Sequence, residues 1–260
     1  MKAHPPQPSA CPLAAVDQRL ADTHRLWHQA EAAYFDPDGF RLAVQNAIQT
    51  LRSVTFIVQK HKAIIPDFKN WYGDLSTKER GKWQERLHAD PLMRWLVEAR
   101  NRIEKEGDLE ANSFVRAEII ASYLDEGPRI EIPAKLFQSP RALLRTIPDG
   151  AVAEHVRRHG VLRLQRRWVE NTLPDYELLD AIAIAFGKIT ELVHDAHRQI
   201  GLSPPQTVHG DAGESYDLPA MAWRLPCMIA HDLPRTADFS LADGTKIEFE
   251  LKRTTKNVTR

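Results

Sequence analysis

Apolar residues recur every three or four positions along the first part of the chain, a period that predicts amphipathic helices. The clearest stripe lies within residues 40–65 and consists of Val44, Ala47, Ile48, Leu51, Val54 and Val58. The pattern assigns Asp38 as the N-terminal cap of this helix and Pro66 as its end. A weaker stripe predicts an earlier helix over about residues 14–34.

Capping signals predict two more helices before residue 110. In the sequence STKER, Ser76 and Glu79 have the spacing of a capping box, which predicts a helix that continues to about residue 88. Asp90, followed directly by proline, starts the next helix, and Gly107 stands where a left-handed residue ends one. This helix covers about residues 91–106.

After about residue 112 the pattern becomes β-like. The segments RAEIIASYL, RIEIPA and VLRLQRRWV are short, alternating or β-branched, and predict strands. Residues 178–200 form one more strong helical stripe, closed by Gly201. In FSLADGTKIEFEL, alternating apolar residues flank an Asp243-Gly244 turn, which predicts a hairpin whose second strand includes Ile247, Phe249 and Leu251.

These elements together predict the α+β fold class. We expect an N-terminal helical bundle over residues 14–110, followed by a mixed α+β domain over residues 113–260 that ends in the C-terminal β-hairpin. The three tryptophans of the first half, at positions 71, 83 and 95, are expected to pack in the bundle.

Composition excludes several classes of function. Lys plus Arg equals Asp plus Glu, at 35 each, so any nucleic-acid affinity requires a local basic patch. Cys11 and Cys227 lack the spacing of a zinc or redox motif, and Cys227 has apolar neighbours typical of a buried thiol. No secretory signal or long uncharged apolar run is visible. We expect a cytoplasmic protein without a membrane anchor, a disulfide or a cofactor.

One short stretch, WLVEARNRIEKEGD at residues 95–108, carries candidate chemistry. On a helix, Asn101 and Lys105 lie four residues apart and share a face, while Arg100 borders the apolar stripe. The Arg100 guanidinium is placed to snorkel to water, to pair with Glu104 or to project into a groove between helices as an anion-binding fork.

The arrangement resembles the HEPN family, the higher eukaryotes and prokaryotes nucleotide-binding domains, whose active members carry Arg-Asn-x-x-x-His late in a helical bundle. Arg100 and Asn101 match this motif, and Lys105 stands at the histidine position. The resemblance implies a homodimer and metal-independent RNA cleavage in catalytic members. It also implies that Arg100 grips phosphate, Asn101 orients the helix or a ribose group, and Lys105 adds a second cation.

The lysine changes what this motif predicts. Imidazole titrates near neutral pH and can carry protons during cleavage, whereas an ordinary lysine stays protonated. The substitution therefore favours binding of RNA or a nucleotide over cleavage. The alternative interpretation is that the charged residues at 98–106 form a solvated helix face with short-range ion pairs.

A second basic segment is HVRRHGVLRLQRR, which contains no carboxylate. Arg157, Arg158, Arg163 and Arg167 are candidates for contacts with a nucleic-acid backbone, and Trp168 could stack on a base if it were exposed. A structural role for these side chains is the alternative.

Two histidine pairs could bind metal. His194 and His197 form a His-x-x-His element in the last helix, with Glu191 nearby, and His155 and His159 lie four apart beside repelling arginines. Neither pair belongs to a complete metal motif, so we expect no metal site. Glycine-rich phosphate loops and a Gly-x-Ser-x-Gly elbow are absent from the sequence.

The sequence leads to one functional hypothesis and two alternatives. The first is a HEPN-like protein of a bacterial stress or defence system that interacts with RNA or a nucleotide. The second is a non-catalytic protein-protein interaction module, whose helical half binds a partner and whose C-terminal hairpin offers an edge for strand addition. The third is a metal-dependent hydrolase in which His194 and His197 join carboxylates from distant positions.

Overall fold

The computed structural model describes residues 11–74, 79–121, 129–204, 207–209, 214–216, 225–228 and 234–247. The chain forms two compact units. The helical unit comprises residues 1–112 and 168–231, and the sheet unit comprises residues 113–167 and 232–260. The protein is α+β, as predicted, with N-terminal helices followed by strands and a C-terminal hairpin.

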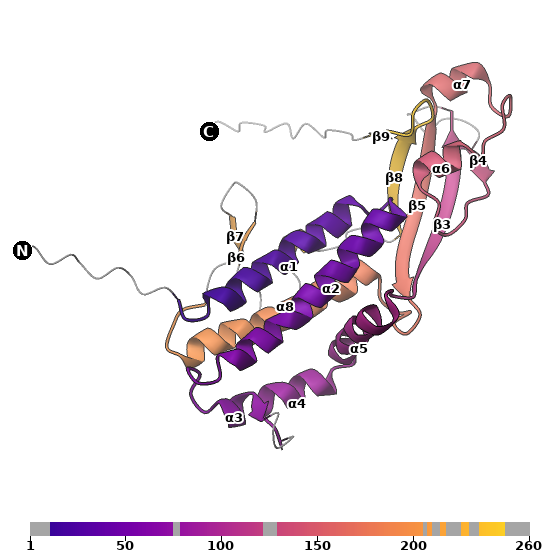
Figure 1. The fold of residues 1–260 in the computed structure, drawn as a ribbon. Coiled ribbons are helices and arrows are strands. Elements are labelled where there is room, and N and C mark those ends of the chain that lie inside the picture. The colour runs from indigo at the N-terminus through magenta and orange to yellow at the C-terminus, as the bar shows by residue number, and fades with distance from the viewer. Residues whose placement is uncertain are drawn as a thin grey trace, which may run out of the picture. The chain divides into compact units, whose positions relative to one another are not determined.

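The helical unit contains the longest helices, and α1, α2 and α8 pack against one another (Figure 1). Its main elements are α1 (Ala14–Ala32), α2 (Pro37–Lys60), α3 (Phe68–Trp71), α4 (Lys82–Ala89), α5 (Pro91–Glu106) and α8 (Leu178–Gln199). Its short elements are β1 (Gly73–Asp74), β2 (Glu79–Arg80), β6 (Thr207–His209), β7 (Glu214–Tyr216) and the 3-10 turn η1 (Pro226–Met228).

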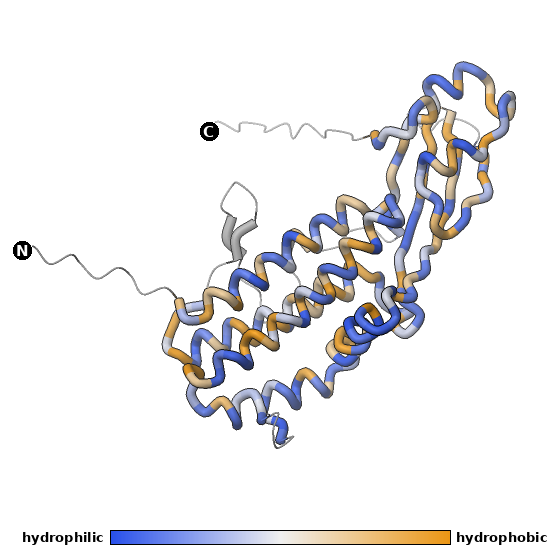
Figure 2. Tube along the Cα trace, viewed as in Figure 1, coloured by the Kyte–Doolittle hydropathy of each residue, from blue (hydrophilic) through white to orange (hydrophobic). Residues whose placement is uncertain are grey.

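The hydrophobic stripe of α2 faces the core, and all six of its predicted members are buried. Apolar and hydrophilic residues recur along the helix, as its amphipathic sequence requires (Figure 2). The cap differs from the prediction: Asp36 is the N-cap, because the following Pro37 fits the first helical position. The helix ends at Lys60, before Pro66.

Helix α5 has the predicted boundaries and caps. The Asp90 carboxylate accepts hydrogen bonds from the backbone N–H groups of Leu92 and Met93, at 2.9 and 3.3 Å. Gly107 ends the helix with φ of 81°, a conformation that glycine adopts without the steric cost of a Cβ atom. Local sequence therefore fixes both ends of the helix that carries Arg100.

The predicted capping box before α4 is wrong where it can be tested. Glu79 pairs with Asp74 in the β1–β2 ladder, and the helix starts three residues later with Gly81 as its N-cap. Ser76 lies outside the described residues. A Cβ atom at Gly81 would lie 2.6 Å from the Gly73 nitrogen, so this close backbone approach requires glycine.

The sheet unit is built on one antiparallel sheet with the strand order β4-β3-β5-β8-β9. The strands are β3 (Ala111–Ile120), β4 (Arg129–Ile132), β5 (Val161–Glu170), β8 (Arg235–Ser240) and β9 (Lys246–Ile247), and the short helices are α6 (Pro140–Leu144) and α7 (Glu154–His159). The predicted hairpin is confirmed: Phe239 pairs with Lys246 around a turn in which Gly244 has φ of 75°. Phe249 and Leu251 lie outside the described residues.

The packing of α8 determines how the chain divides. Its apolar residues are buried against α1 and α2, and its N-cap is the Glu177 carboxylate, which accepts from the Asp180 N–H at 3.1 Å. The compact units therefore depart from the consecutive division into residues 14–110 and 113–260, because α8 shares its core with the N-terminal helices.

Candidate functional site

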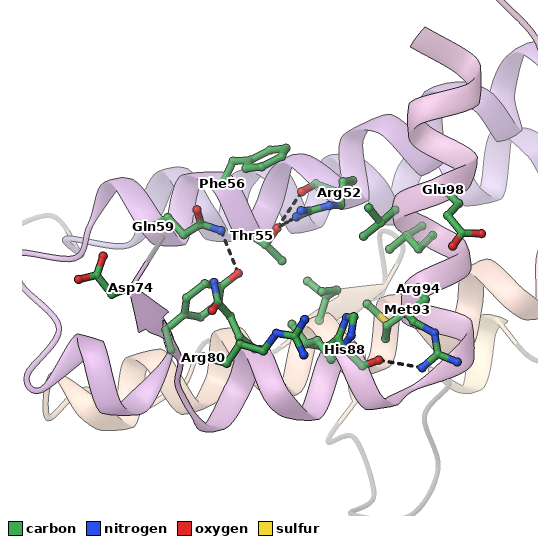
Figure 3. Close-up of a pocket in the computed structure, with 16 residues that line it drawn as sticks. Arg52, Thr55, Phe56, Gln59, Asp74, Arg80, His88, Met93, Arg94 and Glu98 are labelled. Atoms are coloured by element: carbon green, nitrogen blue, oxygen red, sulfur yellow. Dashed lines mark hydrogen bonds between the residues drawn. The ribbon is translucent and has the colours of Figure 1, made fainter. Parts of the chain in front are cut away.

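A cavity of about 600 Å³ lies between α2, α4 and α5 in the helical unit. Its apolar wall consists of Phe56, Leu87, Met93, Leu96, Val97 and Ile189. Figure 3 shows Arg52 and Gln59 on the α2 side, with Arg80 and His88 on the opposite side. An apolar cavity of this size with a few convergent polar groups has the general character of a small-molecule site, for which volumes of about 300–1,000 Å³ are typical.

Helical spacing brings the polar side chains of α2 to this cavity. Arg52, Phe56 and Gln59 are four and three residues apart, so they occupy one face of the helix. The neighbouring positions Leu51 and Val58 point into the core and are fully buried. The same amphipathic pattern that packs α2 therefore leaves a second face for the cavity.

Arg52 is the half-buried cation of the cavity. Its guanidinium donates to the Thr55 hydroxyl and stacks over the Phe56 ring, with 4.3 Å from the guanidinium carbon to the ring centroid. Burial lowers the pKa of Arg52, and the positive charge of Arg100 lowers it further against an opposing contribution from Tyr72. Among the described residues, no carboxylate lies within 4.0 Å of the Arg52 guanidinium.

Tyr72 and Gln59 form the polar group next to Arg52. The Gln59 amide donates to the Tyr72 hydroxyl at 2.9 Å. Burial raises the pKa of Tyr72, although the hydrogen bonds with Gln59 and Thr55 and the charge of Arg52 oppose this effect. The phenol therefore stays neutral and can hydrogen-bond a ligand without adding negative charge.

The far end of the cavity has two more arginines. Arg94 donates to the His88 and Ala89 carbonyl oxygens at 2.8 and 3.1 Å, which satisfies acceptors at the end of α4. Arg80 is exposed at the lining, and Asp74 and Glu98 are the acidic lining residues. Arg94 is thus held by backbone contacts, whereas Arg52 faces the apolar part of the cavity.

The structure places the predicted residues Arg100, Asn101 and Lys105 outside this lining. Arg100 pairs with Glu104 at 2.5 Å and donates to the Asn101 amide oxygen at 3.1 Å. Its guanidinium carbon lies 5.7 Å from the Phe56 centroid, so it reaches the side of the cavity wall. Lys105 is exposed in the last turn of α5. Of the three predicted placements of Arg100, the structure shows the pair with Glu104.

Arg102 pairs with a buried carboxylate, a contact that the sequence analysis missed. Its guanidinium pairs at 2.7 Å with Glu170, whose side chain is fully buried. The Glu170 carboxylate also accepts from the Trp95 indole at 3.0 Å and from Thr172. Burial alone would raise the pKa of Glu170, but the hydrogen bonds from Thr172, Arg102 and Trp95 outweigh it and lower the pKa.

The two other tryptophans of the predicted set are also buried in the helical core, and they share a carboxylate. The Trp71 and Trp83 indoles both donate to Asp195 at 2.7 Å. Burial would raise the pKa of Asp195, but these hydrogen bonds and the charge of Arg198 lower it. The indoles thus combine packing with hydrogen bonding to a charged group.

Three of the predicted basic residues are paired with carboxylates. Arg157 lies 3.5 Å from Asp149, and Arg158 lies 2.9 Å from Glu154. Arg163 on β5 binds Asp238 on β8 through two hydrogen bonds of 2.8 and 2.9 Å. Arg167 lies on the half-buried face of β5 that also carries Arg163, as strand alternation predicts.

Trp168 lies on the opposite face of β5 and is buried. Its indole donates to the Tyr34 carbonyl at 2.9 Å, and its ring stacks on Phe40 with a centroid distance of 4.7 Å. Base stacking on Trp168 therefore has no accessible surface in this structure.

Of the two histidines that the metal-dependent alternative requires, His194 and His197, the second has other partners. Glu191 binds Arg86, and His197 turns to Asp17 at 3.2 Å and to the Cys11 sulfur at 3.5 Å. Burial alone would lower the pKa of His197, but its hydrogen bonds with Asp17 and the Val193 carbonyl raise it to about 9. Within the described residues, His194 belongs to no group of three metal-donor side chains.

Two other groups of three metal donors exist among the described residues. One contains Cys11, Asp17 and His197, and the other contains His24, His28 and Cys227. The pair His24 and His28 was missed in the sequence analysis, although its spacing of one helical turn is visible in the sequence. The approach of Cys227 from more than 200 positions away is not visible in the sequence.

Cys227 is half-buried, so the prediction of a sheltered thiol describes part of its environment. Burial raises its pKa to about 11. Its sulfur lies 3.1 Å from His24 Nε2, a polar contact that the apolar neighbours in the sequence did not suggest.

The interaction-module hypothesis draws on apolar residues exposed in the sheet unit. These residues are Phe114, Ile130, Leu136 and Phe137. In the described sheet, β4 and β9 are the edge strands. This hypothesis and the predicted homodimer stay predictions.

Comparison with known proteins identifies the family. A helical core with a cavity does not by itself identify a class of protein, but residues 4–260 match the family described as bacteriophage lambda protein ea47. Protein ea47 of Escherichia phage lambda is 38% identical over 175 residues, which cover 66% of this chain and 41% of the phage protein. The chain belongs to the phage lambda Ea47 family. It matches no solved structure.

The resemblance to the HEPN family is therefore wrong, because a different family accounts for nearly the whole chain. The physical reason is that Arg-Asn-x-x-x-Lys is a short pattern on a charged helix face. The pair between Arg100 and Glu104 explains the arginine without an active site. Among the described helices, none combines the length and apolar character needed to cross a membrane.

Proposed function

We propose that the helical unit binds a small anionic ligand with an apolar, planar body in the cavity beside α2. The observation that carries this proposal is Arg52, a half-buried guanidinium that lines the cavity with no described carboxylate at ion-pair distance. Charged groups removed from water normally have a partner, because burial of an unpaired charge is costly.

The electrostatics around Arg52 favour an anion. Burial and the neighbouring Arg100 both act against the protonated guanidinium. A bound carboxylate or phosphate would supply the missing counter-charge and a charge-assisted hydrogen bond, worth about 1.5–3 kcal/mol. Arg80 and Arg94 at the other end of the lining would add to the attraction.

The other lining residues indicate the chemistry of the uncharged part of the ligand. Phe56 and the aliphatic residues offer apolar surface, and Gln59 and Tyr72 offer neutral hydrogen-bonding groups. An aromatic ring bearing an anionic group satisfies both parts of the cavity. Nucleoside monophosphates have this chemistry, and they are the class of ligand that we propose.

Calorimetric titration tests the proposal with AMP and GMP, and with adenosine and inorganic phosphate as separate halves of the ligand. We expect a monophosphate to bind and the uncharged nucleoside to bind more weakly. Arg52→Gln should reduce the affinity for the monophosphate by about 10–100-fold, since it removes one charge-assisted hydrogen bond.

Two matched variants sharpen the result. Arg41→Gln removes an arginine from the same helix but outside the lining, so it should leave the affinity unchanged. Arg52→Lys keeps the charge and loses the planar fork, so an intermediate affinity is expected. Equal weakening by Arg41→Gln and Arg52→Gln, or no binding by the wild type, would contradict the proposal.

A further inference from the structure

The side chains of His24, His28 and Cys227 converge at a point separate from the cavity. His24 Nε2 lies 3.1 Å from the Cys227 sulfur and 3.1 Å from His28 Nε2. All three candidate donor atoms lie within 4.8 Å of one another. The histidines are one turn apart on α1, and η1 brings the cysteine to them.

The hydrogen bond on the far side of His28 directs a lone pair into this cluster. His28 Nδ1 lies 3.0 Å from the Glu31 carboxylate, which accepts a hydrogen bond when Nδ1 carries the proton. In the neutral ring, Nε2 is then an acceptor that faces His24. A carboxylate that holds the outer nitrogen of a histidine is the usual support for a metal ligand.

The distances suit a tetrahedral metal ion. With bonds of about 2.3 Å to sulfur and about 2.0 Å to nitrogen, ligand atoms in a tetrahedral zinc shell lie roughly 3.3–3.6 Å apart. The two 3.1 Å separations are slightly shorter, so a small side-chain movement would admit the ion. Because soft sulfur and imidazole nitrogen are the donors, zinc fits better than magnesium or calcium.

We propose that His24, His28 and Cys227 bind a zinc ion, with the Glu31 carboxylate holding His28 in its ligating tautomer. Binding displaces the thiol proton, which passes to solvent as the thiolate bonds to zinc. The described residues supply three donors, so the fourth position of a tetrahedral shell takes water or a ligand. Catalytic zinc sites have this composition of three protein ligands and one exchangeable position.

The second donor group, formed by Cys11, Asp17 and His197, is a poorer metal site. His197 Nε2 faces both the carboxylate and the thiol, and Nδ1 contacts the Val193 carbonyl at 2.9 Å. A protonated imidazole that donates from both nitrogens satisfies these contacts without a metal. Each donor group contains one of the two cysteines, which gives the proposal an internal control.

Cobalt titration of the full chain, purified without a polyhistidine tag, tests the site. We expect one Co²⁺ per chain, a sulfur-to-cobalt charge-transfer band, strong visible bands of a tetrahedral centre and displacement of cobalt by Zn²⁺. Cys227→Ser should abolish the charge-transfer band, whereas Cys11→Ser should retain it. No sulfur-to-cobalt band in the wild type, or loss of the band in Cys11→Ser alone, would overturn the proposal.

Two further measurements separate ligation from folding. Circular dichroism of the apo proteins establishes whether Cys227→Ser is folded, and Zn²⁺ should raise the thermal midpoint of the wild type but not of this variant. Glu31→Gln keeps all three ligands, and we expect it to weaken zinc binding by about 10–100-fold. An unchanged zinc affinity in Glu31→Gln would overturn the assigned role of Glu31.

Discussion

The Glu170 network and the Arg52 cavity lie in the same helical unit, but the arginine of the first has a carboxylate partner and the arginine of the second has none among the described residues. Arg102 meets a fully buried carboxylate, which also receives hydrogen bonds from Trp95 and Thr172. Arg52 lines a cavity in which the described residues provide no carboxylate at ion-pair distance. The first region is electrostatically complete, and the second lacks an anion.

This difference separates a structural arginine from a candidate binding arginine. Removal of one partner from a buried, hydrogen-bonded ion pair strongly destabilises the folded protein, because the other charge stays buried without its counter-charge. A cation without a partner contributes little to stability and is available to a ligand. The same substitution at the two positions should therefore have very different effects on unfolding.

Arg102→Met is expected to give the largest effect. It leaves the Glu170 carboxylate buried without its cation, at a cost of about 3–5 kcal/mol in the free energy of unfolding. Urea unfolding at neutral pH measures this loss. The double variant Arg102→Met/Glu170→Leu should recover much of it, and a loss below about 1 kcal/mol in the single variant would contradict the comparison.

A pH series extends the comparison to His197, a third buried polar group. Its pKa in the folded state, about 9, lies above the ordinary value of 6.5, so folding favours the protonated ring. The stabilisation is complete below about pH 6.5, declines as the pH rises to about 9 and is absent above that value. The amount is on the order of 3 kcal/mol.

Urea unfolding of wild type and Asp17→Asn between about pH 6 and about pH 9 measures this contribution. The variant removes the carboxylate that contacts His197, so its stability should change less with pH. Identical pH profiles for the two proteins would show that the contact with Asp17 does not stabilise the protonated ring.

Removal of one polar group from each region compares their hydrogen bonds. Trp95→Phe keeps an aromatic ring but removes a donor to the charged Glu170, and should cost about 1.5–3 kcal/mol. Tyr72→Phe removes only neutral contacts, those with Gln59 and Thr55, and about 0.5–1.5 kcal/mol is expected. Thermal and urea unfolding measure the loss of stability in each variant. A larger loss in Tyr72→Phe than in Trp95→Phe would contradict the comparison between the two regions.

Arg52→Met should give the smallest change in stability, within about 1 kcal/mol of wild type. The substitution removes a charge that has no described carboxylate partner and keeps a flexible apolar chain beside Phe56. Urea unfolding without added anions measures it, with Arg102→Met as the matched comparison. A loss similar to that of Arg102→Met would mean that Arg52 is a structural residue.

Local sequence was sufficient to predict most of the helices and the C-terminal hairpin. Asp90 and Gly107 determine the two ends of α5 through contacts within a few residues, and Asp243-Gly244 determines the turn between β8 and β9. Such features depend on backbone conformation and short-range hydrogen bonds, which a sequence displays directly. The start of α4 was not predicted, because the N-cap Gly81 is required by the close approach of the Gly73 backbone, which the sequence does not show.

The candidate sites were much harder to predict from the sequence than the helices and the hairpin. Arg100 belongs to a short motif that is visible in the sequence. The role of Arg102 depends on Glu170, which is distant in the sequence, and the role of Arg52 depends on the lack of a described carboxylate partner. A sequence lists charges but does not say which of them are desolvated, and desolvation decides the cost of an unpaired group. His24 and His28 were missed in the sequence analysis, and Cys227 joins them only through the tertiary structure.

The sequence by itself determined the helical stripes, both caps of α5, the alternating strands and the fold class, because these follow from periodicity and local backbone preferences. Tertiary structure alone decided that α8 joins the N-terminal helices, that Glu170 meets Arg102, and that Cys227 meets His24. These outcomes depend on contacts between segments far apart in the chain, where burial and charge act through space.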